Sequence, residues 1–107
     1  MSKIDWYVEL VTAWSRERGI LENGKVTTQT LKLVSEMGEL ADNVAKGNDV
    51  TDDIGDCLVV LNNIAVMSGT SLEACLKHAY NDIKDRKGYL NVEGVFIKQV
   101  ADARLTP

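Results

Sequence analysis

Two pairs of carboxylates are the residues of this 107-residue chain whose types and spacing could do chemistry. Glu36 and Glu39 form one pair, and Asp53 and Asp56 form the other. Within each pair the partners are three residues apart, so on a helix they lie one turn apart on the same face. If the two helices fold back on each other around the short link "GND", Glu39 and Asp56 differ in height along the helix axes by only about 3 Å. The spacing therefore predicts that both pairs converge on one helix–helix contact.

A converging set of carboxylates needs a positive charge to offset it. Like charges repel one another, and partial burial adds a desolvation penalty. Ligands that are all oxygen favour Mg²⁺, Mn²⁺ or Ca²⁺ over Zn²⁺. A di-iron site of the ferritin type needs a Glu-x-x-His motif, which the single histidine, His78, does not complete. The pairs therefore predict a Mg²⁺ site, with Mn²⁺ as an alternative metal.

The same pairs could instead form a solvated helix face, which is the ordinary role of acidic residues on helices. Two features favour the metal site. Aliphatic residues flank both pairs, so the acids lie beside positions that belong in a core. Gly38 and Gly55 lie inside the pairs, and each costs about 1 kcal/mol of helix propensity relative to Ala. This cost predicts that another element approaches closely at both glycines.

The rest of the sequence predicts an all-α chain of helices joined by short links. Its one proline is the last residue, and most glycines fall between apolar periodic segments. Helices are expected over residues 5–18, 28–46, 50–68 and 70–87. Thr27 and Thr70 are the expected N-caps of the second and fourth helices, and Gly47 follows the second. Residues 89–107 are expected to form a short irregular tail, either a hairpin or a loop with one helical turn.

The third expected helix indicates that the chain associates with itself. Residues 57–67 are apolar on nearly every side, so this helix has to be covered from several directions. Three companion helices from one short chain cover it poorly, whereas copies of the second and third helices would complete the cover. The expected fold is one all-α domain over residues 1–107, a four-helix bundle completed by homo-oligomerisation.

Composition and charge restrict the expected partners. The net charge is −4, which argues against a general nucleic-acid-binding surface, because such a surface needs a basic excess. Cys57 and Cys75 form no CxxC motif, and we expect both to be reduced core residues of a cytoplasmic protein. The N-terminus has no apolar signal-peptide segment, and the longest apolar run, "CLVVLNNIAVM", is about half a membrane span. We therefore expect a soluble protein with no nucleic-acid or membrane partner.

Candidate substrate-binding residues lie at both ends of the helical part. Asn81 and Lys84 share one face near the end of the fourth helix, and Arg86 points elsewhere. Cations there either favour the helix dipole while solvated or meet the phosphates of a metal-bound nucleotide. Trp6 and Trp14 share a face of the first helix, where they either pack in the core or stack on a nucleobase.

The acid motifs resemble those of a known family. "EMGEL" followed by "DDIGDCLVVLNNIA" is similar to the MazG-like all-α nucleoside triphosphate pyrophosphohydrolases, whose signature is Glu-Glu-x-x-Glu on one helix and Glu-x-x-Asp on the next. The resemblance covers residues 29–98 and includes the "RKG" and "GVFIK" segments. It implies Mg²⁺-dependent hydrolysis of an NTP or dNTP between the α- and β-phosphates, giving a nucleoside monophosphate and pyrophosphate. It also implies a homo-dimer or homo-tetramer in the cytoplasm of a bacterium or a phage-infected host.

The family's metal ligands transfer to four positions of this sequence. Glu36 and Glu39 match the second and third glutamates of the first motif, and the resemblance implies metal ligation by both. Asp53 stands where the second motif usually has Glu, and Asp56 matches its Asp. As Asp53 is one methylene shorter than Glu, it either ligates through water or needs closer helices.

A second departure concerns the catalytic base. Ser35 replaces the first glutamate of the motif, so any role of that carboxylate as base passes to Glu36 or Glu39. Asn81 and Lys84 occupy positions where the family contacts nucleotide or phosphate. Two other hypotheses remain open. One is a catalytically silent helical oligomer that binds metal or nucleotide for regulation or assembly, and the other is a structural bundle whose acids are solvated.

Overall fold

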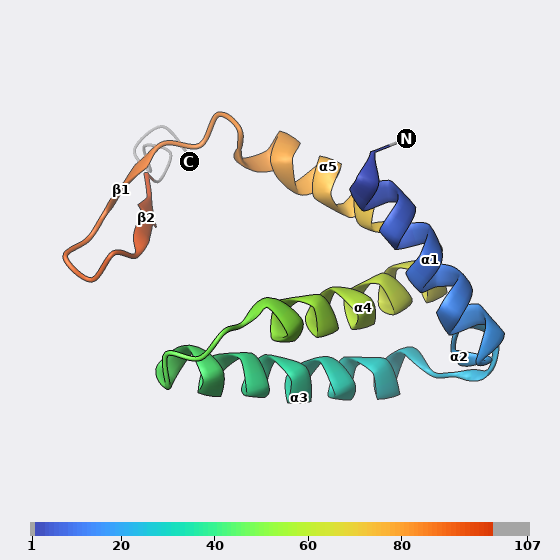
Figure 1. The fold of residues 1–107 in the computed structure, drawn as a ribbon. Helices are drawn as coiled ribbons and strands as arrows, with labels where there is room; N and C mark the ends of the chain where they lie inside the picture. Colours follow the sequence, from blue (N-terminus) through green and yellow to red (C-terminus); the bar gives the residue numbers. More distant parts are fainter. Residues whose placement is uncertain (1, 100–107) are drawn as a thin grey trace. The chain divides into compact units, whose positions relative to one another are not determined.

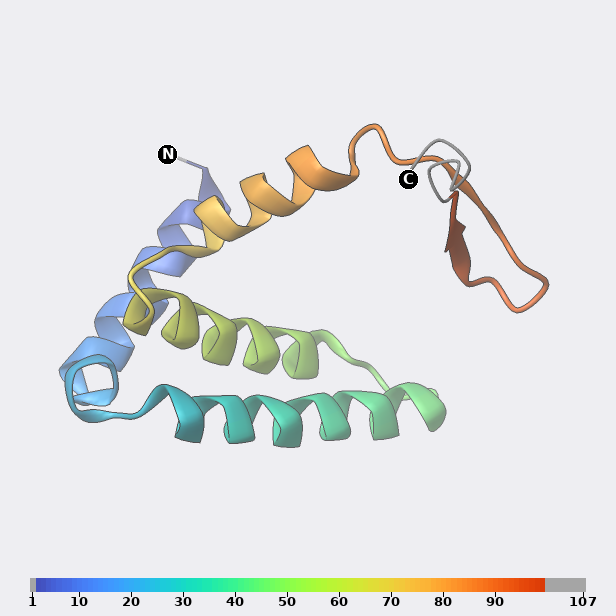
Figure 2. The same cartoon turned by 180° about the vertical axis from the view of Figure 1, so that it is seen from behind.

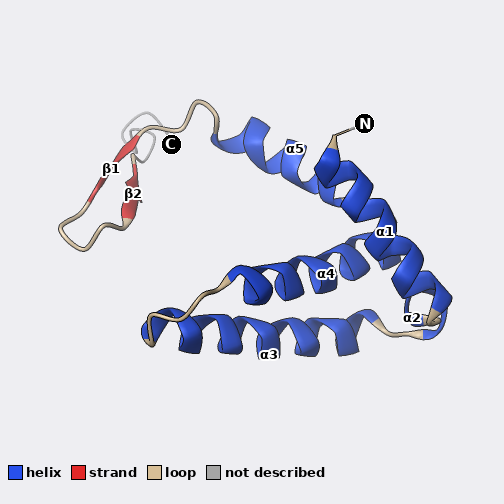
Figure 3. Cartoon of the chain, in the orientation of Figure 1, coloured by secondary structure: helices blue, strands red, loops and turns tan. Residues whose placement is uncertain are grey.

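The computed structural model describes residues 2–99, which form five helices and one two-stranded hairpin (Figure 1). The elements in chain order are α1 (Lys3–Glu17), α2 (Ile20–Asn23), α3 (Val26–Ala45), α4 (Thr51–Met67), α5 (Leu72–Ile83), β1 (Gly88–Leu90) and β2 (Phe96–Lys98). The prediction of a mainly helical chain is confirmed, and the strands of the described part are confined to the hairpin (Figure 3). The chain divides into two compact units, Met1–Cys75 and Leu76–Pro107.

The first unit is built on an antiparallel pair of helices. Figures 1 and 2 show α3 and α4 lying side by side, with α1 crossing α4 near the end of α4. The least exposed residues of α3 repeat at spacings of four and three, which places them in one line facing α4. These residues, which we call the α3 seam, are Gln29, Leu33, Glu36, Leu40 and Asn43.

Polar side chains fasten α1 to this pair. Ser15 is fully buried, and its Oγ donates a hydrogen bond to Oδ1 of Asn63 at 2.6 Å. Nδ2 of Asn63 donates in turn to Oε1 of Gln29 on the α3 seam at 3.1 Å. Beside them, Nδ2 of Asn62 donates to Oγ1 of Thr12 at 2.8 Å. Because buried amides without partners are costly, these bonds fix how α1 crosses α4.

Side-chain caps begin α1 and α5, and several helix ends differ from the predicted bounds. Ser2 caps α1 by accepting a hydrogen bond from the Asp5 amide. α3 begins at Val26, two residues before its predicted start, and has no side-chain cap, so the prediction of Thr27 as its cap is wrong. The cap of α5 is Ser71, whose Oγ accepts from the Ala74 amide at 3.0 Å.

At the other helix ends, some predicted capping residues agree with the structure and others do not. The predicted capping role of Thr70 is wrong by one residue, because Ser71 provides the cap. Gly47 follows α3 with φ 71°, as expected, since this left-handed conformation favours glycine. Gly19 ends α1 in the same way, and the short α2 that follows was not predicted.

In the second unit, the hairpin decides where α5 ends. The helix ends at Ile83, four residues before the predicted end, because the backbone near Lys87 joins the hairpin: the Gln99 amide donates to the Lys87 carbonyl at 2.8 Å. Strands β1 and β2 pair antiparallel, with Tyr89 opposite Ile97. Of the two alternatives for the tail, the hairpin is confirmed; residues 100–107 lie outside the described residues.

Three expectations about packing differ from the structure. At Gly38 and Gly55, an added Cβ would meet no atom within 4 Å apart from the neighbouring backbone of its own helix, so no other described element of this chain approaches closely there. Both cysteines are free, but only Cys57 is buried, and the prediction of a core position is wrong for Cys75. The buried positions of α4 are also less apolar than predicted, since they include Asn62 and Asn63.

Among the described residues, no single helix is both long and apolar enough to cross a membrane. The broken pair of α4 and α5 passes that test on length and composition alone, as core helices of folded proteins also do.

The buried Ser15–Asn63 bond yields the first prediction. Ser15→Ala removes the donor to a buried amide oxygen, so we expect the free energy of unfolding to fall by about 1–3 kcal/mol. Urea unfolding followed by circular dichroism, at one fixed chain concentration, measures the change. Ser35→Ala is the matched control, because Ser35 is exposed on α3. Equal losses in the two variants would contradict a role for the buried bond.

Candidate metal centre

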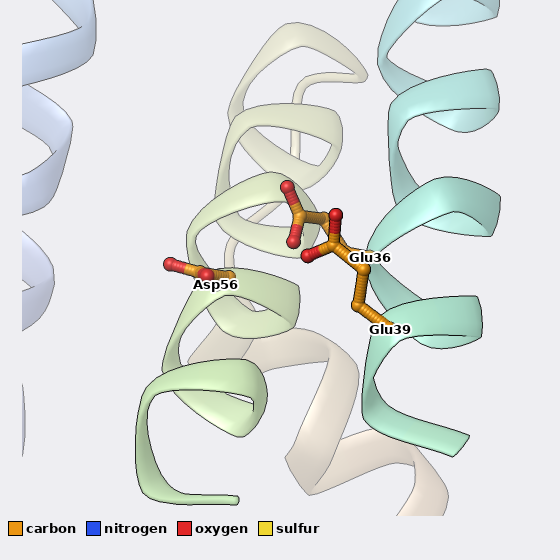
Figure 4. A group of neighbouring side chains, drawn as sticks. All are labelled: Glu36, Glu39 and Asp56. Carbon is orange, nitrogen blue, oxygen red and sulfur yellow. The ribbon is translucent and has the colours of Figure 1, made fainter. Parts of the chain in front are cut away.

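Three of the four predicted carboxylates come together between α3 and α4. Glu36 and Glu39 extend from α3 toward α4, the helix that carries Asp56 (Figure 4). One oxygen of each carboxylate lies within 4.8 Å of an oxygen of the others. Two oxygens on opposite sides of one Mg²⁺ are about 4 Å apart, so small side-chain movements would bring all three into ligand distance. We call Glu36, Glu39 and Asp56 the acid cluster.

Glu36 is the buried member of the cluster and lies at the middle of the α3 seam. Its residue surface is only 7% exposed, and its Oε2 has no hydrogen-bond partner. The polar seam residues one heptad before and after it both have partners on α4: Gln29 binds Asn63, and Asn43 binds Asp53. Because a buried unpaired carboxylate oxygen is costly, Glu36 is a position where a bound cation would supply the missing partner.

The charges of the cluster act on one another. The neighbouring Glu36 carboxylate raises the pKa of Glu39 above its ordinary value, and partial desolvation adds to the rise. Two ionised carboxylates cannot donate to each other, so protonating Glu39 would supply the donor that Glu36 lacks. Desolvation, followed by the charges of Asp52 and Glu36, raises the pKa of Asp56. Burial, with the cluster charges next, raises the pKa of the Cys57 thiol, which favours its neutral form.

One cation already contacts the cluster. Nζ of Lys32 lies 3.1 Å from Oε1 of Glu36, and this hydrogen bond raises the pKa of the Lys32 ammonium. The sequence analysis missed Lys32, although its i,i+4 spacing to Glu36 was a readable signal for an ion pair. The ammonium reaches Oε1 and leaves Oε2 unpartnered.

Asp53 is placed differently from the other three acids. It is buried, and its Oδ2 accepts a hydrogen bond from Nδ2 of Asn43 at 2.9 Å. Nδ2 of Asn48 donates to Oδ1 of Asn43 at 3.0 Å, which ties this pair to the link between α3 and α4. Asp53 is outside the group of carboxylates that lie within 4.8 Å of one another. Its role as a metal ligand stays a prediction, and Asn43 is a partner that the sequence analysis missed.

The predicted substrate-binding residues are distributed over both units. Asn81 lies on α5 and Lys84 directly after it, both in the second unit. Arg86, also in that unit, lies 4.0 Å from Asp82 in an ion pair. Trp6 is an exposed residue of α1, with its ring centroid 5.4 Å from that of Tyr7. Their contacts with a nucleotide stay predictions.

The residues present fit a hard divalent cation. Three carboxylates from two helices offer oxygen ligands at suitable separations, and one buried oxygen among them has no partner. Oxygen-only ligation of this kind suits Mg²⁺ or Mn²⁺, which complete their coordination with water or substrate oxygens.

Comparisons with known proteins identify one relative and no family. No protein-family model matches the chain, and no solved structure matches it. An uncharacterized 18.2 kDa protein from the rep-hol intergenic region of Haemophilus phage HP1 (strain HP1c1) is 33% identical over 63 residues. The match covers 57% of this chain and 39% of that protein, so the chain spans well under half the length of the relative.

The raised pKa of Glu39 yields a prediction about stability without metal. Since its pKa is higher in the folded than in the unfolded chain, the ionised carboxylate opposes folding. The resulting loss of folding stability is absent below the ordinary Glu39 pKa of 4.5. It grows as the pH rises from there through the raised pKa of the folded chain. In EDTA, we therefore expect Glu39→Gln to melt above wild type near pH 7 and to match it near pH 4.

Thermal melts across this pH range measure the difference in Tm between the two chains. Glu9→Gln, at an exposed position on α1, is the control and should stay close to wild type throughout. If Glu39→Gln melts below wild type near pH 7, the carboxylate stabilises the metal-free fold, contrary to this account.

Proposed function

We propose that the chain is a Mg²⁺-dependent pyrophosphohydrolase of nucleoside triphosphates, related to the MazG-like enzymes. The observation that carries the proposal is the unpartnered, buried Oε2 of Glu36 beside the carboxylates of Glu39 and Asp56. The resemblance of "EMGEL" and "DDIGD" to the family's metal motifs supports the same conclusion. A relative in a Haemophilus phage fits the phage or bacterial cytoplasm that this resemblance implies.

The acid cluster would hold the cation, with Asp53 as a fourth ligand, direct or through water. When bound, Mg²⁺ would supply positive charge that offsets the charge developing on the leaving pyrophosphate. Glu39 is the better placed of the two glutamates to act as base, because it is exposed whereas Glu36 is buried. A water oxygen would bond to the α-phosphorus as the bond to the β-phosphate oxygen breaks, and Glu39 would take the water's proton.

We further propose that two or more copies assemble through α3 and α4. Along α3, Leu31 is 72% exposed and Val34 58% exposed, and they begin a line that continues through the open position at Gly38. α4 carries a second exposed line, made of Ile54, Leu58 and Leu61. Apolar residues at spacings of three and four on both helices match what helices of a second copy would bury.

One substitution supports the second hypothesis, that of a silent binding protein. Ser35 is exposed on α3 at the position where the family motif has its first glutamate. If the family uses that glutamate for turnover alone, its replacement by Ser35 would remove catalysis and leave the metal ligands in place. The two hypotheses differ in whether bound nucleotide is cleaved.

Pyrophosphate release tests the enzymatic proposal. We expect release from at least one member of a panel of NTPs and dNTPs with Mg²⁺, at substrate saturation. Glu39→Gln and Asp56→Asn should each lower kcat by about 100-fold or more, because the first removes the proposed base and the second removes a proposed metal ligand. Asp42→Asn is the control, since Asp42 pairs with Lys46 on an exposed part of α3.

Two results would decide against hydrolysis. Binding of Mg²⁺ and nucleotide without any release of pyrophosphate would favour the silent oligomer. A folded chain that binds neither Mg²⁺ nor nucleotide would favour a structural bundle with solvated acids.

The assembly is tested by molar mass in solution. Light scattering after size-exclusion chromatography should give at least twice the 11.8 kDa of one chain. Val34→Glu should lower that mass toward one chain, because it places a charge in the apolar interface. Val92→Glu is the control, as Val92 is a fully exposed valine in the hairpin loop. A wild-type mass of one chain at high protein concentration would contradict the assembly.

A further inference from the structure

We propose that Lys32 is a tethered counter-ion that holds Glu36 when no metal is bound and that the incoming divalent cation displaces. This inference concerns the cluster's own residues and rests on the metal centre of the proposed function. It assigns a role to a residue that neither the sequence motifs nor the family resemblance single out. Its consequence is that metal affinity is set by competition within the chain.

The position of the Lys32 ammonium places it beside the buried member of the acid cluster. Lys32 precedes Glu36 by one turn on α3, and Glu39 follows by one turn, so all three project from one side of the helix. Nζ of Lys32 lies 3.1 Å from Oε1 of Glu36. Of the ion pairs found among residues 2–99, it is the one that reaches a carboxylate of the acid cluster.

Lys32 neutralises the acid cluster only in part. One ammonium faces three carboxylates, and the buried Oε2 of Glu36 stays without a partner. A divalent cation carries twice the charge and can bind oxygens of all three acids at once. It therefore satisfies the oxygen that Lys32 does not reach.

The Lys32 side chain can move from Glu36 into solvent. Its side chain is 58% exposed, whereas the side chain of Glu36 is only 9% exposed. An ammonium and a divalent cation on the same carboxylate repel each other, and the lysine has a flexible stem that reaches water. Moving Lys32 into solvent leaves the buried glutamate in place, so the exchange needs no rearrangement of α3 or α4.

The chain contains a matched control for this pair. Asp42 near the end of α3 pairs at 2.7 Å with Lys46, the C-cap residue that follows the helix, at the same i,i+4 spacing but with the acid first. Both of those side chains are 61% exposed, and Asp42 is outside the acid cluster. Lys32 thus pairs with a buried member of the acid cluster, whereas Lys46 pairs with an exposed carboxylate outside it.

Calorimetric titration with Mg²⁺ alone tests the inference. Lys32→Met should bind Mg²⁺ about 2- to 5-fold more tightly than wild type, which is the factor expected when a competing ion pair of this kind is removed. Its metal-free Tm should be lower than that of wild type, because the acid cluster loses its counter-ion. Lys46→Met should leave Mg²⁺ affinity unchanged, and Lys32→Arg should stay near wild type because it keeps the charge.

The direction of the change separates this role from a structural one. A variant that merely loosens the site would bind Mg²⁺ more weakly, so equal or weaker binding by folded Lys32→Met overturns the inference. Lys32→Gln provides a second uncharged variant if Lys32→Met does not fold, and the same expectation applies to it. If wild type itself binds no Mg²⁺, the metal centre and the proposed function fail together, whereas Mg²⁺ binding that is unaffected by Lys32 overturns this inference alone.

Discussion

The burial of Glu36 between α3 and α4 is the constraint on which the rest of the first unit depends. Its carboxylate lies at the centre of the α3 seam, where a leucine would be the ordinary choice for a helix pair. The flanking polar positions are satisfied across the seam, Gln29 by Asn63 and Asn43 by Asp53. These outer bonds keep the helices aligned although Lys32 neutralises the charge at the centre only in part. The fold thereby keeps a buried carboxylate close to two others, an arrangement that a cation would stabilise.

The polar character of the seam explains why the unit has so small an apolar core. Cys57, Val60 and Ala65 are its buried apolar residues, whereas larger aliphatic side chains on both helices face outward. A unit with so little buried apolar area is marginal, because hydrophobic burial is the main term that offsets conformational entropy. Association through those outward faces would bury more apolar area and leave the α3 seam available for the proposed metal. The proposed assembly therefore uses the outward apolar faces of α3 and α4, and the proposed site uses the faces that these helices turn toward each other.

Much of this arrangement was predictable from residues close together in the sequence. The pairs at positions 36 and 39 and at 53 and 56 indicated shared helix faces, and Gly47 indicated the end of α3. Predictions of helix ends failed where two neighbouring residues compete for one role or where a residue distant in the sequence forms the deciding contact. Thr70 and Ser71 are both good caps, and sequence alone did not separate them. The end of α5 depends on the pairing of Lys87 with Gln99 across the hairpin, which helix propensity does not register.

The sequence by itself determined the helical character of the chain, which residues share a helix face, and that four acids lie near one helix–helix contact. These properties follow from the period of the α-helix and from local capping, which act within a few residues. Only the tertiary structure decided how the acids divide. The register of α4 against α3 brings Asp56 to Glu36 and Glu39, while Asp53 meets the amide of Asn43. Register is set by the fit of side chains across the seam, so no spacing within one helix determines which carboxylate is left without a partner.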